Sequence, residues 1–462
     1  MDGSQPINPF LSGNYAPVRD EEDFDLTVTG EIPAGLAGVF YRNGPNPQFH
    51  PGADYHWFGG DGMIHGFFVE SGKVRYRNRY VRTPKWLAEN AAGRQLFGTF
   101  GNPLTTDPSV LGEDAGVANT NILWHAGRLM ALEEGHKPFE LDPLTLESRG
   151  YLDQYRGRVT AHPKIDPDTG EMTWFGYSTG EAPLNATVSY GVTSASGEVL
   201  RRDDFEAPYS SMVHDFLVTS GHVLFPILPL TGSLERAMNG GPAYAWEPDK
   251  GAFVGVMARD AGVETLRWFE TEACYVFHPM NAWEEGDRIF ADVMEYPAAP
   301  LFPNADGSRG DDSAARLVRW TFDLAGDSNR IKREPLDDLA GEFPRFDERR
   351  AGLAYRHGWF AGTSQRPGRF GFDAIAHVDL ATGRRATHDL PLGDVTGEPV
   401  FVPRSADAAE GDGWVISVVY RGNEDRSDFL VFDARDLPAG PIATARVPRR
   451  VPFGFHGNWR PA

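Results

Sequence analysis

Four histidines stand in short segments where apolar or small residues meet a turn signal. They are His162 in TAHPK, His214 in MVHDF, His278 in FHPMNAW and His456 in FGFHGN. An imidazole at a strand end is held by a rigid scaffold, and its nitrogens suit iron, zinc and copper. The four are too far apart in sequence to share one helix, as the histidines of an HExxH site do. The pattern therefore predicts a metal at a point where distant parts of the sequence converge.

Three glutamates occupy apolar or turn-flanked positions that suit a supporting role: Glu134, Glu342 and Glu398. A cation held by neutral imidazoles keeps its full charge, so nearby carboxylates are expected to orient the rings and balance that charge. For any single one of the histidines, the pattern also allows a purely structural role. Cys274, four residues before His278, is open between a packed apolar group and a further ligand.

Short strands joined by turns are the elements that must position these residues. The sequence of 462 residues has 52 Gly and 35 Pro, many of them beside short apolar runs, and long amphipathic stretches are scarce. Residues 84–98 are the best helical candidate, with Trp86, Leu87, Leu96 and Phe97 as apolar anchors. These features predict an all-β protein with a closed architecture, and they favour a β-propeller with unequal blades. We expect one domain over residues 1–462, with residues 1–36 as an N-terminal surface segment.

Charge and termini restrict the partners and the compartment. A net charge of −21 argues against nucleic acid and against electrostatic docking on anionic membranes. One cysteine suits a reducing compartment, and the N-terminal MDGSQPINPF has neither the basic nor the apolar part of a signal peptide. We predict a cytoplasmic protein without a transmembrane segment. An apolar rim near residues 86–97 is compatible with weak hydrophobic contact to a membrane.

Several strings, in order from about residue 8 to the C-terminus, resemble the carotenoid cleavage oxygenase family. That family includes the retinoid isomerohydrolase, the carotenoid and apocarotenoid cleavage dioxygenases, and the lignostilbene and isoeugenol oxygenases. The strings are YRNGPNP from Tyr41, GDGMIH from Gly60, TAHPKIDP, MVHDF, FHPMNAW, GEPVFVPR and the terminal FHGNW. The resemblance implies a seven-bladed β-propeller with one non-haem Fe(II) on its axis and a dome of loops and helix above it.

The resemblance also implies roles for individual residues. The four histidines become the ligands of one Fe(II) per protein molecule, and the three glutamates hydrogen-bond three of the imidazoles, whereas His162 has no such partner. Thr120 matches a position whose methyl group restricts where O2 binds. The implied reaction is oxidative cleavage of a conjugated C=C bond by O2, with two carbonyl products, usually aldehydes, and no external reductant.

The resemblance leaves two substrate classes open. FGTFGNP, VANT and FVPRS are nearest to the lignostilbene and isoeugenol branch, which binds a phenol through a tyrosine and a lysine. This protein has Phe100 and Glu133 at those places, which favours a longer apolar polyene. We predict a dioxygenase for a carotenoid or apocarotenoid, with a stilbenoid or phenylpropenoid as the alternative. Phe58, Phe100, Glu133 and Phe302 are the predicted substrate-binding residues.

Two other outcomes stay open at this point. The histidines would be structural if the propeller served as a non-catalytic binding scaffold. Alternatively, the iron would be kept but the reaction would differ, as in the isomerase branch or in the incorporation of one oxygen atom.

Overall fold

The computed structural model describes residues 8–52, 55–100, 105–364 and 371–462. The first seven residues of the predicted N-terminal segment and residues 101–103 of the FGTFGNP string lie outside these ranges. The protein divides into two compact units. The terminal unit comprises Met1–Asp153, Val418–Leu430 and Ile442–Ala462, and the central unit comprises Gln154–Ser417 and Val431–Pro441.

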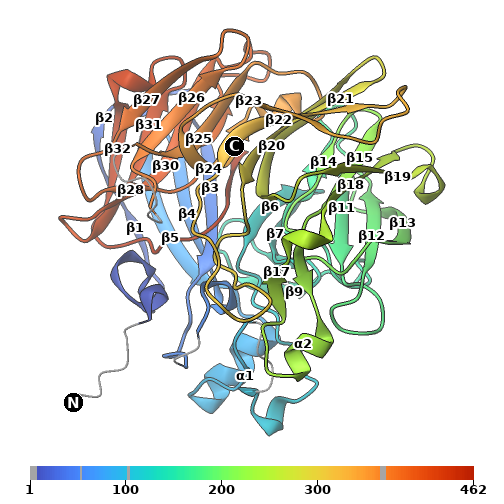
Figure 1. Cartoon of the computed structure of the whole chain (residues 1–462). Helices are drawn as coiled ribbons and strands as arrows, with labels where there is room; N and C mark the ends of the chain where they lie inside the picture. The colour runs from blue at the N-terminus through green and yellow to red at the C-terminus, as the bar shows by residue number, and fades with distance from the viewer. Residues whose placement is uncertain (1–7, 53–54, 101–104, 365–370) are drawn as a thin grey trace. The chain divides into compact units, whose positions relative to one another are not determined.

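Two sheets of the terminal unit are built from antiparallel hairpins (Figure 1). The first has the order β1-β5-β4-β3-β33 and the second β6-β7-β8-β9. The β4–β5 hairpin turns through Ser71 and Gly72, whose φ angles of 51° and 75° match a type I′ turn. The strands are β1 (Asp23–Asp25), β3 (Gly38–Pro45), β4 (Gly62–Glu70), β5 (Lys73–Tyr80), β6 (Asn121–His125), β7 (Arg128–Leu132), β8 (Phe139–Leu141), β9 (Ser148–Tyr151) and β33 (Gly457–Pro461).

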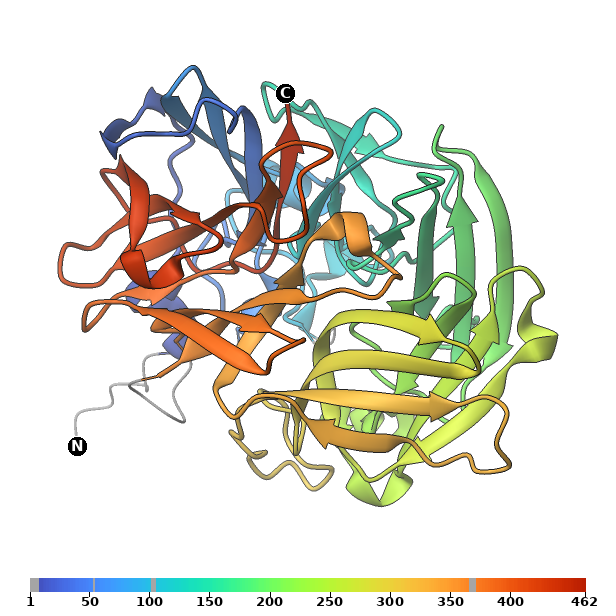
Figure 2. The ribbon, with the colours of Figure 1, turned by 90° about the horizontal axis from the view of Figure 1, so that it is seen from above.

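Four further sheets belong to the central unit, and each has four antiparallel strands (Figure 2). Their orders are β10-β11-β12-β13, β14-β15-β18-β19, β20-β21-β22-β23 and β24-β25-β26-β27. A two-stranded ribbon of β16 (Leu230–Gly232) and β17 (Tyr244–Trp246) lies between β15 and β18 in the sequence.

The strands of these four sheets are β10 (Lys164–Ile165), β11 (Met172–Tyr177), β12 (Thr187–Thr193), β13 (Val199–Glu206), β14 (Leu217–Val218), β15 (His222–Ile227), β18 (Ala252–Ala258), β19 (Arg267–Thr271), β20 (Tyr275–Glu285), β21 (Arg288–Tyr296), β22 (Arg316–Asp323), β23 (Lys332–Pro335), β24 (Ala340–Phe346), β25 (His357–Thr363), β26 (Ala374–Asp379) and β27 (Arg384–Asp389).

One more sheet follows the order β2-β32-β31-β30-β28, and β29 also pairs with β30. With it, the described residues form seven sheets of four or more strands, and this confirms the predicted seven-bladed, all-β propeller. The predicted surface segment 1–36 supplies two of the strands, β1 and β2. The strands of this sheet are β2 (Thr27–Gly30), β28 (Val395–Thr396), β29 (Val400–Pro403), β30 (Gly413–Arg421), β31 (Arg426–Asp433) and β32 (Pro441–Val447).

Helix is rare in the described residues. The α-helices are α1 (Pro84–Ala92) and α2 (Leu234–Met238). The predicted helix 84–98 is therefore shorter than expected, because Gly93 ends α1 in the left-handed conformation. Leu87, a predicted apolar anchor, is 53% exposed. Short 3-10 helices are η1 (Pro9–Leu11), η2 (Gly13–Tyr15), η3 (Trp57–Gly59), η5 (Pro108–Val110), η6 (Pro248–Lys250), η7 (Val263–Thr265), η8 (Glu348–Arg350) and η9 (Leu437–Ala439).

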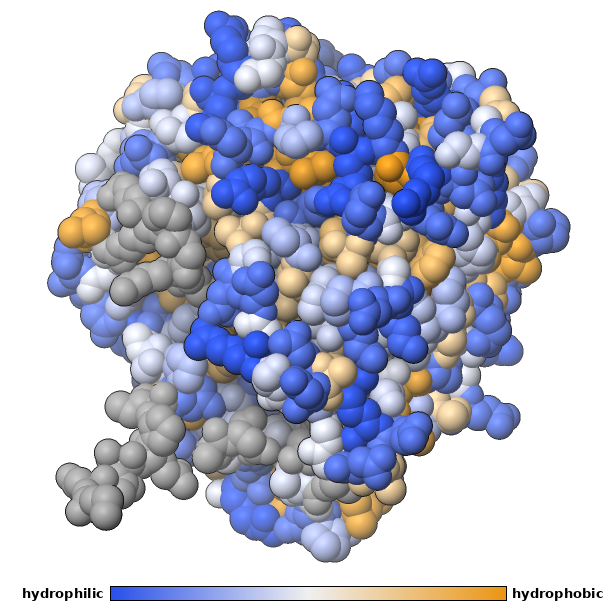
Figure 3. All heavy atoms as spheres, viewed as in Figure 1, coloured by the Kyte–Doolittle hydropathy of each residue, from blue (hydrophilic) through white to orange (hydrophobic). Residues whose placement is uncertain are grey.

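Hydrophilic residues cover most of the face seen in Figure 3, with apolar residues in scattered groups. None of the helices in the described ranges is both long enough and apolar enough to cross a membrane. Weak hydrophobic contact with a membrane stays a prediction, and so do the cytoplasmic location and the single-domain organisation.

Candidate metal centre

Three of the four predicted histidines meet in the central unit. His162 Nε2 lies 3.1 Å from His214 Nε2, which in turn lies 3.1 Å from His278 Nε2. The three residues are only 7%, 8% and 9% exposed. A neutral imidazole carries one N–H, so three Nε2 atoms at one point cannot all be satisfied by one another. A shared cation satisfies all three lone pairs, and this donor set fits iron. We call these residues the histidine trio.

Edge strands position the trio. His162 precedes β10, His214 precedes β14, and His278 lies within β20; each of these strands is at the edge of its sheet. The sequence predicts histidines at strand ends, whereas two of the three precede their strand. Pro279 bends β20 rather than ending it, because the pairing with β21 shifts register on both sides of this residue and then continues to Glu285.

A carboxylate fixes the ring of His278. Glu342 Oε2 lies 2.5 Å from His278 Nδ1. The register of β24 shifts after Glu342, and the next residue, Phe343, has a φ of 55° and stacks its ring 5.3 Å from that of His278. Positive φ is uncommon for a bulky residue, so the backbone is strained where the carboxylate is aimed. An Nδ1–H donated to Glu342 leaves the Nε2 lone pair directed into the trio.

His162 also has a carboxylate near its Nδ1, which sequence reasoning missed. Asp215 Oδ2 lies 3.6 Å from this atom, and Asp215 Oδ1 lies 2.7 Å from Lys164 Nζ. Burial raises the pKa of the Asp215 carboxyl, and the Lys164 ammonium opposes that shift. The available signal was the position of each charge, since Asp215 directly follows His214 and Lys164 lies two residues after His162.

The terminal unit holds His456 beside Thr120. His456 is buried, directly precedes β33, and donates its backbone N–H to the Thr120 carbonyl at 3.2 Å. Thr120 Oγ1 donates to Asn119 Oδ1 at 3.0 Å, and Asn119 Nδ2 donates to the Phe58 carbonyl at 2.8 Å. One hydrogen-bond network therefore fixes His456, Thr120 and Phe58 together.

The other two predicted glutamates lie in connections between strands. Glu134 is half-buried in the turn after β7. Glu398 is buried between β28 and β29, where its Oε1 lies 3.3 Å from Arg345 Nη1. Arg345 is also 3.0 Å from Glu348, so this guanidinium contacts two carboxylates.

An aromatic cluster contains two of the predicted substrate-binding residues. The Phe58 and Phe100 ring centroids are 5.6 Å apart, and the His56 ring lies 4.7 Å from the first and 5.3 Å from the second. Phe455, the neighbour of His456, has its ring 5.5 Å from that of Phe58. This arrangement offers an apolar surface with one polar ring for a flat substrate.

Glu133 and Phe302, the other two predicted substrate-binding residues, are both buried. The Glu133 carboxylate accepts the Val117 N–H at 3.0 Å and lies 2.7 Å from His136 Nδ1. Glu133 is only 8% exposed, and these two partners compensate the cost of burying its charge. Phe302 is buried in the central unit, in the connection between β21 and β22.

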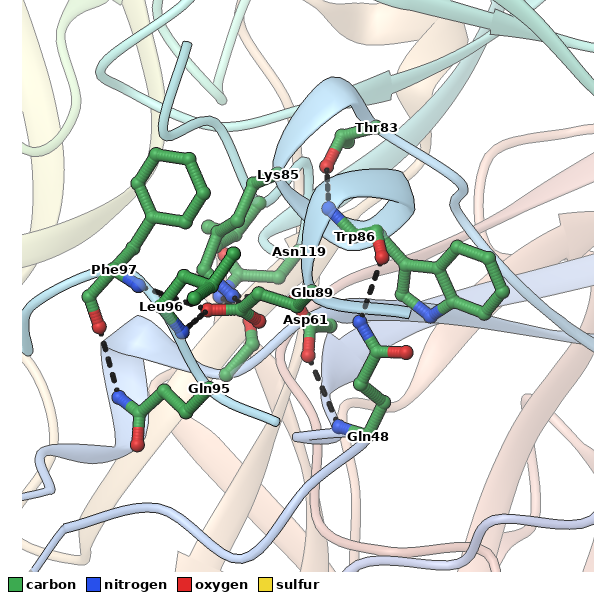
Figure 4. A network of polar contacts seen from close by, with 12 residues as sticks. Gln48, Asp61, Thr83, Lys85, Trp86, Glu89, Gln95, Leu96, Phe97 and Asn119 are labelled. Carbon is green, nitrogen blue, oxygen red and sulfur yellow. Dashed lines mark hydrogen bonds and ion pairs between the residues drawn. The ribbon is translucent and has the colours of Figure 1, made fainter. Parts of the chain in front are cut away.

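A buried ionic network under α1 was also missed (Figure 4). Lys85 Nζ lies 2.7 Å from Asp61 and 2.9 Å from Glu89. Burial by itself lowers the pKa of the Lys85 ammonium, but the two carboxylates raise it above its usual value. Glu89 also accepts the backbone N–H groups of Leu96 and Phe97, which fixes the segment leading to Phe100. The signals were the i,i+4 spacing of Lys85 and Glu89 and the aspartate of GDGMIH.

Both the sequence and the fold match those of known proteins. The profile of the family described as retinal pigment epithelial membrane protein matches residues 15–461. The sequence is 41% identical to isoeugenol monooxygenase of Pseudomonas putida over 98% of each protein. It is 39% identical to lignostilbene-α,β-dioxygenase isozyme III of Sphingomonas paucimobilis over 99% of this protein and 98% of that one. The crystal structure of Pseudomonas brassicacearum lignostilbene dioxygenase matches with a TM-score of 0.95 and 36% identity over 99% of each protein.

Proposed function

We propose that this protein oxidatively cleaves the alkene C=C bond of a stilbenoid or phenylpropenoid. The premise is that it belongs to the carotenoid cleavage oxygenase family of non-haem iron enzymes, which cleave double bonds. The observation that carries the proposal is the convergence of three buried Nε2 atoms in a protein whose relatives include isoeugenol and lignostilbene oxygenases.

This substrate class replaces the carotenoid or apocarotenoid prediction as the favoured one. That prediction rested on Phe100 and Glu133. The Glu133 carboxylate is taken up by the Val117 N–H and by His136, so its negative charge is not a reason to reject a phenol. The relatives reported above are named for isoeugenol and lignostilbene, which supports the alternative. Phe100 remains a difference that a test must address.

The metal centre in this proposal has four imidazole ligands, the trio and His456. Fe(II) held by these four imidazoles would supply the electrons that activate O2. Glu342 holds the tautomer of His278, and we assign the same role toward further imidazoles to Glu134 and Glu398. The methyl group of Thr120, fixed in the network that holds His456, narrows the position left for O2.

Substrate positioning falls to the aromatic cluster of the terminal unit. Phe58 and Phe100 offer ring faces on which a phenyl group stacks, and His56 offers a polar ring in contact with both. An imidazole can donate a hydrogen bond to a phenol oxygen or accept its proton. In this proposal His56 does part of what the tyrosine and lysine do in the lignostilbene and isoeugenol branch. Phe302 stays a proposed lining residue.

Oxygen uptake tests the function. The protein is loaded with Fe(II) under anaerobic conditions and given O2 with isoeugenol, with 4-hydroxystilbene or with an apocarotenal, and the aldehydes are identified. We expect uptake and an aromatic aldehyde with one or both phenolics. Uptake with the apocarotenal alone would restore the carotenoid interpretation. Failure to retain iron would favour the non-catalytic scaffold, and 18O2 labelling distinguishes one-oxygen from two-oxygen incorporation.

Phe100→Tyr tests the phenol interpretation directly. We expect the KM for 4-hydroxystilbene to fall roughly threefold to tenfold, the size of one neutral hydrogen bond. The matched control is 4-methylstilbene, which has no oxygen to share a hydrogen bond with the new hydroxyl and should gain nothing. An equal effect on both substrates would mean that Phe100 does not face the phenol.

A further inference from the structure

We propose that His357 and His377 form a second metal site, outside the four-histidine centre, for a borderline divalent cation such as zinc. His357 begins β25, and His377 lies in β26, the strand beside it. His357 Nδ1 lies 3.0 Å from His377 Nε2. The corresponding nitrogen separations in the histidine trio are 3.1 Å. The two rings therefore already hold the spacing at which the trio converges.

The sheet holds the two rings rigidly. His377 pairs across the ladder with Trp359, and the two rings stack at 5.3 Å between centroids and 25° between planes. Trp359 is fully buried and stacks in turn on Phe401 at 4.6 Å. A ligand on a strand and packed on a buried indole has little freedom to lose, so less entropy is lost when a cation binds.

A cavity of about 290 Å³ gives the pair access to solvent, and both rings line it together with Glu410 and Gly411. Gly411 has a φ of 75°, and a Cβ at this position would come within 2.6 Å of His357 Cδ2. A side chain here would push the His357 ring out of its place. The cavity leaves room for water molecules to complete the coordination of a cation held by two imidazoles.

The charges around the cavity are arranged in pairs. Arg356 binds Asp379 through two hydrogen bonds of 2.8 and 2.7 Å, and Arg435 lies 3.3 Å from Asp412. Glu410 accepts the backbone N–H groups of Arg356 and His357, and its nearest guanidinium, that of Arg350, is 3.7 Å away. The arginines that line the cavity are thus matched by aspartates. Glu410 is left to offset the charge of a bound cation.

Both rings are neutral at pH 7, because burial lowers the pKa of His377 to about 4 and also lowers that of His357. Without a cation, one ring donates its N–H to the other. When a cation binds, the donor ring carries its proton on its other nitrogen, and both facing nitrogens become ligands without net proton release. Two imidazoles suit zinc, nickel or copper, whereas the arginines would suit an anion only if their aspartates released them.

Zinc titration of the iron-loaded protein tests the site. Zinc chloride is added to the holoenzyme in a calorimeter, and iron and zinc are counted by elemental analysis after gel filtration. We expect one zinc per protein molecule in addition to the iron. His357→Asn and His377→Asn should each weaken zinc binding at least tenfold, with the iron content and the turnover unchanged. The retained iron also shows that these variants fold.

His50→Asn is the matched control, because His50 is exposed and lies in the terminal unit. It should bind zinc as the unchanged protein does. No zinc beyond the iron would overturn the proposal, as would a second zinc that persists in both variants. Binding of inorganic phosphate in place of zinc would overturn it as well, because the cavity would then be an anion site.

Discussion

Two groups of histidines in the central unit have nearly the same nitrogen spacing but different surroundings. The trio is buried, and Nδ1 atoms of its rings face carboxylates: Glu342 at 2.5 Å from His278 and Asp215 at 3.6 Å from His162. His357 and His377 line an open cavity, and the partner of each ring is the other ring. Spacing alone therefore does not separate a catalytic centre from a peripheral site.

The trio and the His357–His377 pair differ in the number of nitrogens that converge. They also differ in the group that contacts the other nitrogen of each ring. A carboxylate on Nδ1 fixes the tautomer and raises the basicity of Nε2, which strengthens the metal bond. The His357 and His377 rings support each other instead, so a cation there should bind more weakly and exchange with solvent.

The largest effect is expected from removal of one trio ligand. His214→Ala should lose the iron and lower turnover by more than about 100-fold, because a ligand contributes more than the residues that orient it. His377→Ala in the other group should keep both iron and turnover. Iron content and oxygen uptake are measured on the same preparations. Retained iron with full turnover in His214→Ala would refute the ligand assignment.

Acid should lower the stability of the protein through the protonation of His377, in the His357–His377 pair. The folded pKa of His377 is about 4, below its ordinary value of 6.5, so the unfolded protein binds more protons between these values. Stability is therefore lost as pH falls from 6.5 toward 4. We expect protonation of this ring to lower the free energy of unfolding by about 2 kcal/mol, after allowance for its partial exposure.

Urea unfolding of zinc-free wild-type protein and of His377→Asn at pH 7 and pH 4.5 measures this contribution. The difference between the two proteins removes the titration that they share. An equal loss of stability in both would show that His377 is not held neutral by the fold.

Glu342→Gln tests the support of the trio. The amide keeps the size of the side chain but accepts a weaker hydrogen bond from His278 Nδ1, so iron affinity and turnover should fall about 10- to 100-fold. The comparison is Glu410→Gln beside the His357–His377 pair. This variant should weaken zinc binding and leave iron affinity unchanged. Iron affinity is measured by competition with a chelator. Equal effects of the two variants on iron would remove the contrast.

The sequence was sufficient for the architecture and for the histidines that the fold brings together. Local signals such as Ser71-Gly72 predict a hairpin turn, and strings such as TAHPK and FHPMNAW mark the histidines. These features depend on neighbouring residues, which a sequence shows directly. The trio could be expected because its members share one local pattern, although that pattern did not distinguish strand starts from strand ends.

Features that depend on partners distant in sequence were not predictable in the same way. Glu133 was predicted from its place in the sequence, which does not show that its carboxylate accepts the N–H of Val117, sixteen residues earlier. Leu87 looked like an anchor of α1, yet the buried face of that helix carries Lys85 and Glu89, and the Lys85 ammonium pairs with both Glu89 and Asp61. Burial of a charge is decided by its partner, and the partner is set by the tertiary fold.

The smallest effect is expected at Asp215, where the contrast between the two groups is finest. Its carboxylate is 3.6 Å from His162 Nδ1, beyond hydrogen-bond distance, and it is also shared with Lys164. Asp215→Asn should therefore weaken iron binding by less than about tenfold, because it removes an electrostatic contact rather than a direct hydrogen bond.

Lys164→Met, which frees Asp215 to act on His162 alone, should change iron affinity in the opposite direction. Chelator competition measures both variants against Glu342→Gln. A loss at Asp215→Asn as large as that at Glu342→Gln would mean that distance to Nδ1 does not rank the carboxylates.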